Sequence, residues 1–479
     1  MEGLSDKESK VFDALVDVRY HREVFCGQPL YPPQIEAVEL VEHHIAEQSG
    51  KTITIRSSRQ TMKNECSATI HARALALYSK EGGIIVRTAP THKPQIVNSK
   101  LRLEKMVKID PIIRGKVKKR EGYIYECGEA QIQFLSAQDR TNVEGATASL
   151  LLDIDEAHKV DKGKFEEAFG PMAAWKAVPT VMWGVAADKQ DLLYEYRRYN
   201  EEYDPALNLQ YPWHVWAELR PEYAKHCEER KGKLGENHPV WLTQYCLIDI
   251  EAIAGLLKPW HIKTILTSEH ARQTEAVSEK RYVAVIDLAG EEEEGEVTIG
   301  RREAPRDATI CWIVEVDYTD IVYDMPKFRV VQGYYWVGKQ FAAGPDGDKG
   351  QQEILLDILN YWRPRKTVID ARGIGAQTAA YVAKRFANVE QYAATADSVS
   401  DDCYGFLALA ENGRISMWQD DESETYRECV RQLKETKYQI FQHDKIRLIK
   451  PQSGAHIDMV KALTYLARCT KKPFERQAW

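Results

Sequence analysis

The chain has 479 residues, enough for two or three domains of ordinary size, and its 44% hydrophobic and 29% charged residues are typical of a folded globular protein. No apolar run reaches the roughly 18 residues of a membrane span, and the polar start MEGLSDKESK lacks the apolar core of a signal peptide, so we expect neither. The nine cysteines are scattered without a C-x-x-C pair, which argues against a disulfide framework or a zinc finger and suits a reducing cytoplasm.

The net charge of −7 does not by itself indicate binding to nucleic acid, although a local basic patch matters more than the total. One such patch lies between positions 100 and 120 and comprises Lys100, Arg102, Lys105, Lys108, Arg114, Lys116, Lys118, Lys119 and Arg120. Two interpretations stay open for it, a solvated basic face and a surface that contacts phosphates.

Residues 31–216 alternate apolar strands with amphipathic helices, the pattern of an α/β domain. The β-rich run KTITIRSS (51–58) is followed by RQTMKNE and by the helical pattern CSATIHARALALYSK. A strand, a tight loop and a helix that opens with a lysine form a phosphate-binding unit. The positions that correspond to G-x-x-x-x-G-K-[ST] are Ser57, Ser58, Arg59, Gln60, Thr61, Met62, Lys63 and Asn64, so both glycines and the final hydroxyl residue are absent.

The acidic half of this signal is SLLLDIDEAH (149–158), a buried-strand pattern that ends in two acids. Asp155 is expected to hold the Mg²⁺ of a bound nucleotide, and Glu156 to polarise the attacking water. A helix cap is the alternative interpretation of two acids at this place. The order and spacing of Lys63 and this strand favour the catalytic interpretation.

A second α/β pattern starts with RYVAVIDLAG (281–290) and runs to the end of the chain. Asp287 ends that strand, Asp370 ends the strand in KTVIDARGIG (366–375), and Asp458 stands in the first turn of a helix predicted over 456–468. Surface loops or hairpins are expected at 291–307 and 338–350.

Three aspartates in this order can converge on one point, and because clustered carboxylates repel, the arrangement makes sense if divalent cations hold them. Two such metals activate water and stabilise the leaving oxygen of a phosphodiester. Turn and helix-cap roles are the alternatives for each aspartate taken alone. Glu315 and Asp317, on the strand predicted over 308–320, are candidate accessory ligands.

The motifs of both blocks resemble those of the large terminase subunit of tailed bacteriophages. SSRQTMKNE is similar to the deviant Walker A loop of that family, YPPQ (31–34) to its adenine-side Q motif, TAPTHKPQ (88–95) to its strand-end A-P-T segment, LLLDIDEAH to its Walker B strand with the catalytic glutamate, and VMWGVAAD (181–188) to its coupling motif. VIDARGIG, FLALAENGRISMWQDDE (406–422) and HIDMVKALTYLA are similar to segments of its nuclease domain. The resemblance covers nearly the whole chain.

This resemblance implies an α/β fold with an N-terminal P-loop (ASCE-type) ATPase domain followed by an RNase H-like (RuvC-type) nuclease domain. Its expected boundaries are 1–255 for the ATPase domain with a helical subdomain or linker, 256–280 for a connector and 281–479 for the nuclease. Gln34 is the implied adenine contact, and Arg59 takes the place of the loop arginine near the γ-phosphate.

The resemblance also implies the cofactors ATP and Mg²⁺, with Mn²⁺ as an alternative in the nuclease site. The implied partners are double-stranded DNA, a portal protein and a small terminase subunit. The implied assembly is a ring on the procapsid in the host cytoplasm and a monomer when isolated, with no membrane partner. The activity would be ATP-driven translocation of DNA and metal-dependent cleavage of concatemers.

Two departures keep other functions open. Met62 stands where the family has a glycine, and Asn64 replaces the hydroxyl residue that touches Mg²⁺, so ATP turnover is expected to be slow or to depend on a partner chain. A cellular helicase-like or resolvase-like ATPase–nuclease is one alternative. A DNA-binding scaffold with a degenerate ATP site is another.

Overall fold

The computed structural model describes residues 5–137, 146–174, 176–288, 308–337, 349–373, 375–441, 445–450 and 456–470. The chain divides into two compact units, one of Met1–Cys227 with Leu242–Ile250 and one of Glu228–Trp241 with Glu251–Trp479. The loops expected at 291–307 and 338–350 lie outside the described residues, apart from positions 349 and 350. Within the described part of the chain, none of the helices is both long and apolar enough to cross a membrane.

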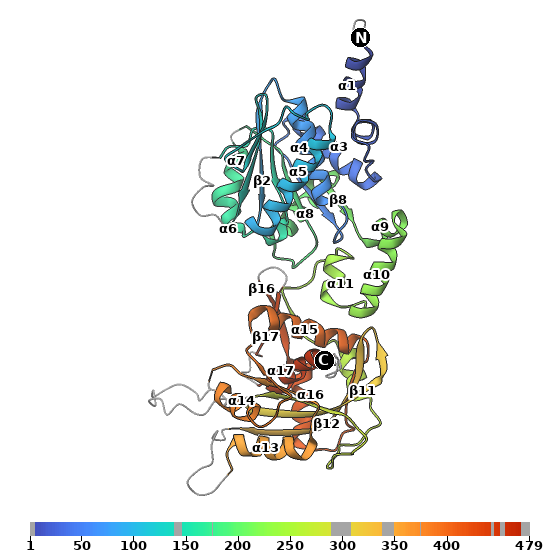
Figure 1. Ribbon diagram of the computed structural model, residues 1–479, viewed down its shortest axis with the longest axis vertical. Helices are drawn as coiled ribbons and strands as arrows, with labels where there is room; N and C mark the ends of the chain where they lie inside the picture. The colour runs from blue at the N-terminus through green and yellow to red at the C-terminus, as the bar shows by residue number, and fades with distance from the viewer. Residues whose placement is uncertain are drawn as a thin grey trace, which may run out of the picture. The chain divides into compact units, whose positions relative to one another are not determined.

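The first unit is built on one sheet of eight strands (Figure 1). Its strands are β1 (Thr52–Ser57), β2 (Gly83–Ala89), β3 (Lys118–Arg120), β4 (Ile124–Cys127), β5 (Ala130–Ser136), β6 (Leu151–Ile154), β7 (Thr180–Gly184) and β8 (Asn208–Tyr211). Its helices are α1 (Asp6–Val16), α2 (Val18–Tyr20), α3 (Pro32–Glu47), α4 (Lys63–Leu77), α5 (Val97–Ile109), α6 (Lys162–Lys164), α7 (Gly170–Ala174), α8 (Leu192–Tyr203) and α9 (Trp213–Leu219). Two further helices, α10 (Pro221–Leu234) and α11 (Pro239–Gln244), contribute residues to both units.

The strand order of this sheet is β3-β4-β5-β2-β6-β7-β1-β8, and the six strands from β5 to β8 run parallel. One strand, β7, therefore lies between β1, which leads into the lysine loop, and β6, which leads into the acids. This additional central strand is the ASCE-type arrangement that the sequence predicted. Because parallel strands end at one edge, the loop after β1 and the acids after β6 meet there.

Helix α4 occupies the centre of the first unit. Ten consecutive residues of it, from Cys66 to Leu75, are buried, which is unusual for a helix with a polar face. The helix contacts both α3 and α5, and Figure 1 shows these three helices on one side of the sheet and α6 and α7 on the other. An apolar cluster that includes Leu152 and Ile154 of β6 fills the second side, so Asp153 between them faces α4.

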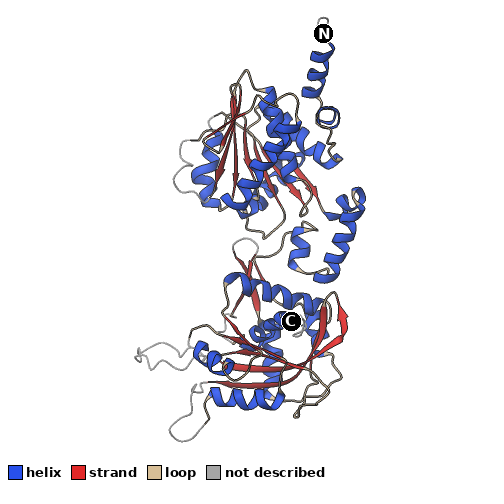
Figure 2. Cartoon of the chain, viewed as in Figure 1, coloured by secondary structure: helices blue, strands red, loops and turns tan. Residues whose placement is uncertain are grey.

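The second unit carries a six-stranded sheet and a three-stranded sheet, with helices on both sides of the larger one (Figure 2). Its strands are β9 (Ile253–Gly255), β10 (Tyr282–Asp287), β11 (Ala308–Val322), β12 (Met325–Val337), β13 (Lys366–Asp370), β14 (Val389–Tyr392), β15 (Ile415–Met417), β16 (Lys437–Phe441) and β17 (Lys445–Ile449). Its helices are α12 (Pro259–Leu266), α13 (Gln351–Trp362), α14 (Gly375–Ala383), α15 (Ala396–Glu411), α16 (Glu424–Glu435), α17 (Asp458–Thr464) and the 3₁₀ turn η6 (Tyr465–Cys469).

The larger sheet has the order β14-β13-β10-β11-β12-β15. The chain runs antiparallel through β10, β11 and β12, while β13 and β14 pair parallel on the other side of β10. This mixed sheet is the RNase H-like fold predicted from the sequence. Residues of β10 alternate between two cores: Val283 and Val285 join the core under α15 and α17, and Ala284 and Ile286 join the core under α13 and α14.

The segment expected as a connector, 256–280, begins inside the second unit. Leu257 and Ile265, near or on α12, belong to the same core as Val283. Just before them, β9 pairs antiparallel with β16 through Ala254 and Tyr438. The apolar residues of this stretch therefore pack in the core of the second unit and do not form a linker.

Helix α17, which carries Asp458, is positioned by a buried tryptophan. The indole Nε1 of Trp312 on β11 donates a hydrogen bond of 2.9 Å to the carbonyl oxygen of Met459. The ring packs against Gly333, its direct partner on β12, because a glycine leaves the space that a Cβ would fill. A Cβ at that place would come within 2.8 Å of ring carbon Cε3.

We expect Gly333→Ala to destabilise the protein by about 1–3 kcal/mol, because the added methyl overpacks the ring of Trp312. The measurement is chemical unfolding followed by tryptophan fluorescence. Gly255→Ala is the matched control, since its Cβ would lie 3.5 Å from the nearest atom, the carbonyl oxygen of Leu257. Equal stability of the two variants would show that the sheet absorbs the methyl and that Gly333 does not set the ring position.

Candidate functional sites

The loop between β1 and α4 is closed by its own hydroxyl groups. The side-chain oxygens of Ser57 and Thr61 lie 2.6 Å apart, and the Thr61 hydroxyl also donates to the carbonyl oxygen of Ser58 at 2.7 Å. Gln60 has a φ of +65°, a left-handed conformation that costs a residue with a side chain about 1–2 kcal/mol. The loop thus keeps a compact turn without the glycines of the usual pattern.

Lys63 begins α4, and its ammonium group pairs with a carboxylate oxygen of Glu156 after β6. Glu156 has a φ of +48°, in the left-handed region. Burial raises the pKa of Glu156, but the charges of Lys63 and His158 outweigh burial and hold this pKa well below its usual range. The predicted phosphate-binding lysine and the predicted water-activating glutamate therefore lie in direct contact.

Asp155 faces an arginine that the sequence analysis did not single out. Nη2 of Arg87, on β2, lies 2.9 Å from Oδ2 of Asp155. Nη1 of the same guanidinium pairs with Asp153, its direct neighbour across the sheet. His71 and Trp183 also donate to Asp153, at 2.7 and 2.8 Å, so this fully buried carboxylate is compensated on three sides.

Met62 and Asn64, the two departures from the phosphate-loop pattern, both fit the structure of the loop. Met62 is buried and has a φ of −148°, so its backbone is outside the left-handed region that would require glycine. The side-chain oxygen of Asn64 accepts a 3.5 Å hydrogen bond from Nη2 of Arg87. Asn64 thus helps to orient the guanidinium beside Asp155.

Gln34 and Arg59, which were predicted to contact the nucleotide, bind other parts of the protein. The side chain of Gln34 accepts from the backbone N–H of Tyr31 at 2.9 Å and so caps the start of α3. Arg59 donates to the side chain of Gln244 at 2.6 Å. The structure does not bring either side chain into contact with Lys63 or Glu156 among the described interactions.

In the second unit, strand register brings two of the three aspartates together. Ile286 of β10 pairs with Ile369 of β13 in parallel, so the next residues, Asp287 and Asp370, end neighbouring strands at the same edge. Side chains alternate along a strand, and Val285 and Val368 lie in the same core, so both aspartates point to the face that α17 covers.

A lysine from α17 bridges this pair. Nζ of Lys461 lies 2.6 Å from Oδ1 of Asp287 and 3.0 Å from Oδ2 of Asp370. The hydroxyl of Tyr465 lies 3.4 Å from the same two oxygens. The guanidinium of Arg372 holds Asp370 from the solvent side, at 3.1 and 3.2 Å.

Asp458 begins α17, one turn before Lys461. Its Oδ2 accepts from the backbone N–H of Ala308 at 3.2 Å and lies 3.3 Å from Nδ1 of His456. Burial raises the pKa of Asp287 to about 7, with the charge of Asp458 among the smaller causes. Asp458 therefore acts on Asp287 through its charge, but ligand atoms of all three aspartates do not lie within 4.8 Å of one another.

These donor groups fit a hard divalent cation, because all three predicted ligands offer carboxylate oxygens. Burial also raises the pKa of Asp370, yet pairing with Arg372 and Lys461 outweighs burial and leaves this pKa below its usual value. For Asp287, burial outweighs the effect of Lys461 on the pKa and favours the neutral form. A divalent cation beside Asp287 would favour its charged form.

Glu315 and Asp317 of β11 lie away from the aspartate site, so the expectation that they are accessory ligands is wrong. Glu315 pairs with Tyr282, at the opposite end of β10 from Asp287. It forms ion pairs with Lys280 at 2.6 Å and Arg329 at 2.9 Å. Asp317 lies further along the same strand, so neither carboxylate reaches the site.

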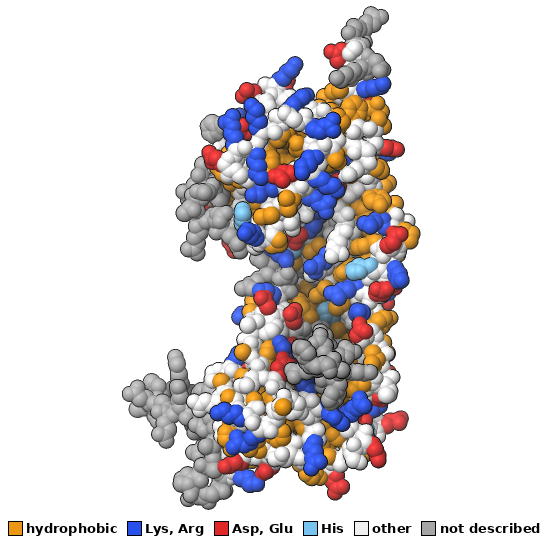
Figure 3. Space-filling model, viewed as in Figure 1, with side chains coloured by type: hydrophobic (Ala, Val, Ile, Leu, Met, Phe, Trp, Pro, Cys, Tyr) orange, Lys and Arg blue, Asp and Glu red, His pale blue; other side chains and the backbone are white. Residues whose placement is uncertain are grey.

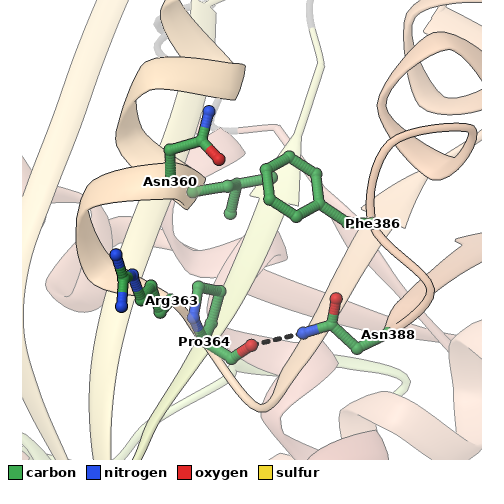
Figure 4. A pocket seen from close by; sticks show the side chains of 6 residues that line it. Asn360, Arg363, Pro364, Phe386 and Asn388 are labelled. Carbon is green, nitrogen blue, oxygen red and sulfur yellow. Dashed lines mark hydrogen bonds between the residues drawn. The ribbon is translucent and has the colours of Figure 1, made fainter.

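A surface hollow of about 480 Å³ lies at the other end of β13 (Figure 4). Pro364, Phe386 and Asn388 line it together with Leu359, Asn360 and Arg363 of α13 and its C-terminal turn. Pro364 precedes β13, whereas Asp370 ends it. The hollow is therefore separate from the aspartate site and holds none of the predicted functional residues.

The basic segment 100–120 is partly neutralised. Arg102 pairs with Glu65 at 3.3 Å, Lys119 with Glu104 at 2.8 Å and Arg120 with Glu126 at 2.6 Å. Figure 3 shows Lys and Arg side chains spread over the visible face of the first unit, with fewer acids among them.

Arg87, Asp153 and Lys461 were missed at the level of sequence, although each left a signal. Arg87 interrupts the apolar strand pattern IIVRTA, and a charge at a buried strand position requires a partner. Asp153 does the same in LLLDID. Lys461 stands three residues after Asp458, which places both on neighbouring positions of one helix face.

The two folds and the two charged centres define a class of protein with an ASCE-type P-loop unit followed by an RNase H-like unit. No protein-family model and no curated protein matches the sequence. The large terminase of the thermophilic bacteriophage D6E has the same two-unit fold: the match covers 92% of this chain and 99% of that chain, with a TM-score of 0.52 and 11% sequence identity. The chain thus has the fold of a phage large terminase.

Two other solved structures are similar at a lower score. The HK97 bacteriophage large terminase matches 95% of this chain and 99% of its own, with 14% identity and a TM-score of 0.41. The large terminase nuclease from thermophilic phage G20c with bound magnesium matches 45% of this chain and 96% of its own, with 11% identity and a TM-score of 0.33.

We expect Arg87→Ala to destabilise the first unit by about 3–5 kcal/mol, because Asp153 and Asp155 would stay buried with less compensating charge. Thermal and urea unfolding measure this loss. Arg102→Ala removes a half-exposed ion pair of the same unit and should cost less than about 1 kcal/mol. A small effect of Arg87→Ala, comparable to that of Arg102→Ala, would mean that water or His71 compensates the acids instead.

Proposed function

We propose that this protein is a large terminase that couples an ATP-driven DNA motor to a metal-dependent DNA endonuclease. The observation that carries the proposal is the in-register pair Asp287 and Asp370 beneath the helix that begins with Asp458. Two carboxylates on one face of an RNase H-like sheet, with a third at the start of the helix over that face, are suited to phosphodiester hydrolysis. The ATPase-like fold of the first unit and the whole-chain likeness to the D6E large terminase support the two-activity form.

In the proposed motor, the N-terminus of α4 and Lys63 bind the terminal phosphates of ATP. Glu156 orients and polarises the attacking water, and its low pKa keeps it ionised for that task. Contact with phosphate would take Lys63 from its ion pair with Glu156. Asp155, which now pairs with Arg87, would hold the magnesium ion of the nucleotide.

In the proposed nuclease, Asp287, Asp370 and Asp458 would hold the divalent cation. When bound, Mg²⁺ or Mn²⁺ supplies Lewis-acid activation of water and stabilises the leaving oxygen. The half-exposed guanidinium of Arg372 is placed to contact a DNA phosphate beside Asp370. The hydroxyl of Tyr465, 3.4 Å from one oxygen of each strand-end carboxylate, helps to hold both in place.

The proposal includes partners that follow from the function. Double-stranded DNA is gripped through its backbone, so binding falls steeply with salt. A portal protein, a small terminase subunit and a ring of copies on the procapsid, in the host cytoplasm, complete the packaging assembly. The motor is proposed for the unit of Met1–Cys227 with Leu242–Ile250, and the nuclease for the unit of Glu228–Trp241 with Glu251–Trp479.

Plasmid cleavage tests the nuclease. We expect the intact protein to cut in Mn²⁺ or Mg²⁺ and Asp370→Ala to lose at least about a hundredfold in rate, because a metal ligand is removed. Asp357→Ala, which breaks a surface ion pair in the same unit, is the matched control and should cut normally. Equal cutting by wild type and Asp370→Ala, or none by either, would reject the three-aspartate site.

ATP turnover tests the motor. Glu156→Gln should lower kcat by about a hundredfold or more, because it removes the group that polarises water, and Lys63→Ala should abolish productive binding. Lys51→Ala breaks an exposed ion pair with Asp204 and is the control. Turnover that survives both site variants would place hydrolysis elsewhere. No turnover by the wild type, even with DNA, would favour the degenerate ATP site that Met62 and Asn64 allow.

A further inference from the structure

Lys461 is the feature of the aspartate site that the proposed reaction does not use. Its ammonium group contacts one oxygen of Asp287 and one oxygen of Asp370 at the same time. The flanking residues Val460 and Ala462 are buried in the core, so the backbone of α17 at this position is held while the side chain reaches across. The contact therefore belongs to the packed arrangement of α17 over the sheet.

The same two oxygens are the ones that a cation shared by these aspartates would bind. Mg²⁺ binds carboxylate oxygens at about 2.0–2.1 Å, well inside the 2.6 and 3.0 Å at which the ammonium now lies. Nζ already fills the space between the two carboxylates. A divalent cation and this ammonium group therefore cannot contact both oxygens together.

Charge leads to the same conclusion. Asp287, Asp370 and Asp458 carry up to three negative charges, which Lys461 and Arg372 reduce in the present arrangement. Divalent cations added beside a lysine that stays in place would meet direct repulsion at close range. The lysine must move before the cation enters, and it is able to, because 29% of its side chain is exposed and its stem is flexible.

We propose that Lys461 competes with divalent cations for Asp287 and Asp370 and so sets the metal concentration at which the nuclease site loads. The inference rests on the proposed nuclease function and adds a positioning residue that holds the metal-free form. In that form the lysine stabilises two buried carboxylates that would otherwise repel each other. Removal of its charge should therefore strengthen metal binding, although it removes a stabilising contact.

The test is equilibrium binding of Mn²⁺ to the full chain, without nucleotide or DNA, followed through the electron paramagnetic resonance signal of free Mn²⁺. The Mn²⁺ binding that is lost in Asp370→Asn is the binding that belongs to this site. This comparison separates it from any Mn²⁺ binding by the first unit. We expect Lys461→Met to bind Mn²⁺ about tenfold tighter than wild type, within the ordinary range for two coupled ligands. Lys461→Arg, which keeps the charge, should not tighten binding.

Two controls separate charge from folding. Lys349→Gln removes another lysine–aspartate pair of the same unit and should leave Mn²⁺ affinity unchanged. Melting temperatures of all variants are measured in chelator, and Lys461→Gln replaces Lys461→Met if the latter is not folded.

Each result bears on the proposal in a distinct way. Tighter binding by Lys461→Met, without it in Lys461→Arg and Lys349→Gln, supports competition. Binding by Lys461→Met that is equal to or weaker than that of wild type, while Asp370→Asn still loses the metal, overturns the competition and leaves the nuclease proposal standing. Absence of any Mn²⁺ binding that depends on Asp370 rejects the metal site and with it both proposals.

Discussion

Buried carboxylates at the carboxyl edge of parallel strands are the constraint on which the second unit depends. The register of β10 with β13 forces Asp287 and Asp370 to end side by side on one face. Two such charges repel each other away from water, and a cation between them reduces that repulsion. Lys461 supplies part of this compensation, because Trp312 holds α17 over this face. The position of α17 therefore determines which side chains compensate the two carboxylates at the edge of the sheet.

The first unit meets the same constraint with other residues. Asp153, Asp155 and Glu156 follow one another at the end of β6, and Arg87 and Lys63 compensate them from two other elements. Arg87 is fully buried and binds two acids at once, a geometry that a planar guanidinium suits better than a lysine. In both units, the acids expected to act with metal ions are held by basic side chains of the chain itself.

This pattern gives the proposed activities a common physical form. Under the proposed function, nucleotide would exchange the ion pair of Lys63 for phosphate contacts, and a cation would exchange the ion pair of Lys461 for metal contacts. In each case the acid already has a partner within the protein. The free energy of ligand binding is therefore the difference between the new contacts and the ion pair that they replace. Reactive acids are thereby kept in place without being left as isolated buried charges.

The sequence by itself determined the two α/β blocks, the lysine at the start of α4 and the aspartates at strand and helix ends, because alternation, helical periodicity and strand-end acids are local patterns. Their partners were decided by tertiary structure. Arg87 meets Asp153 only through the pairing of β2 with β6, and Glu315 is excluded from the aspartate site only by the antiparallel register of β11. Segment 253–266 joins the second unit through pairing with β16 and a shared core. Register and packing join residues far apart in the chain, and no local pattern specifies which distant residue will compensate a buried charge.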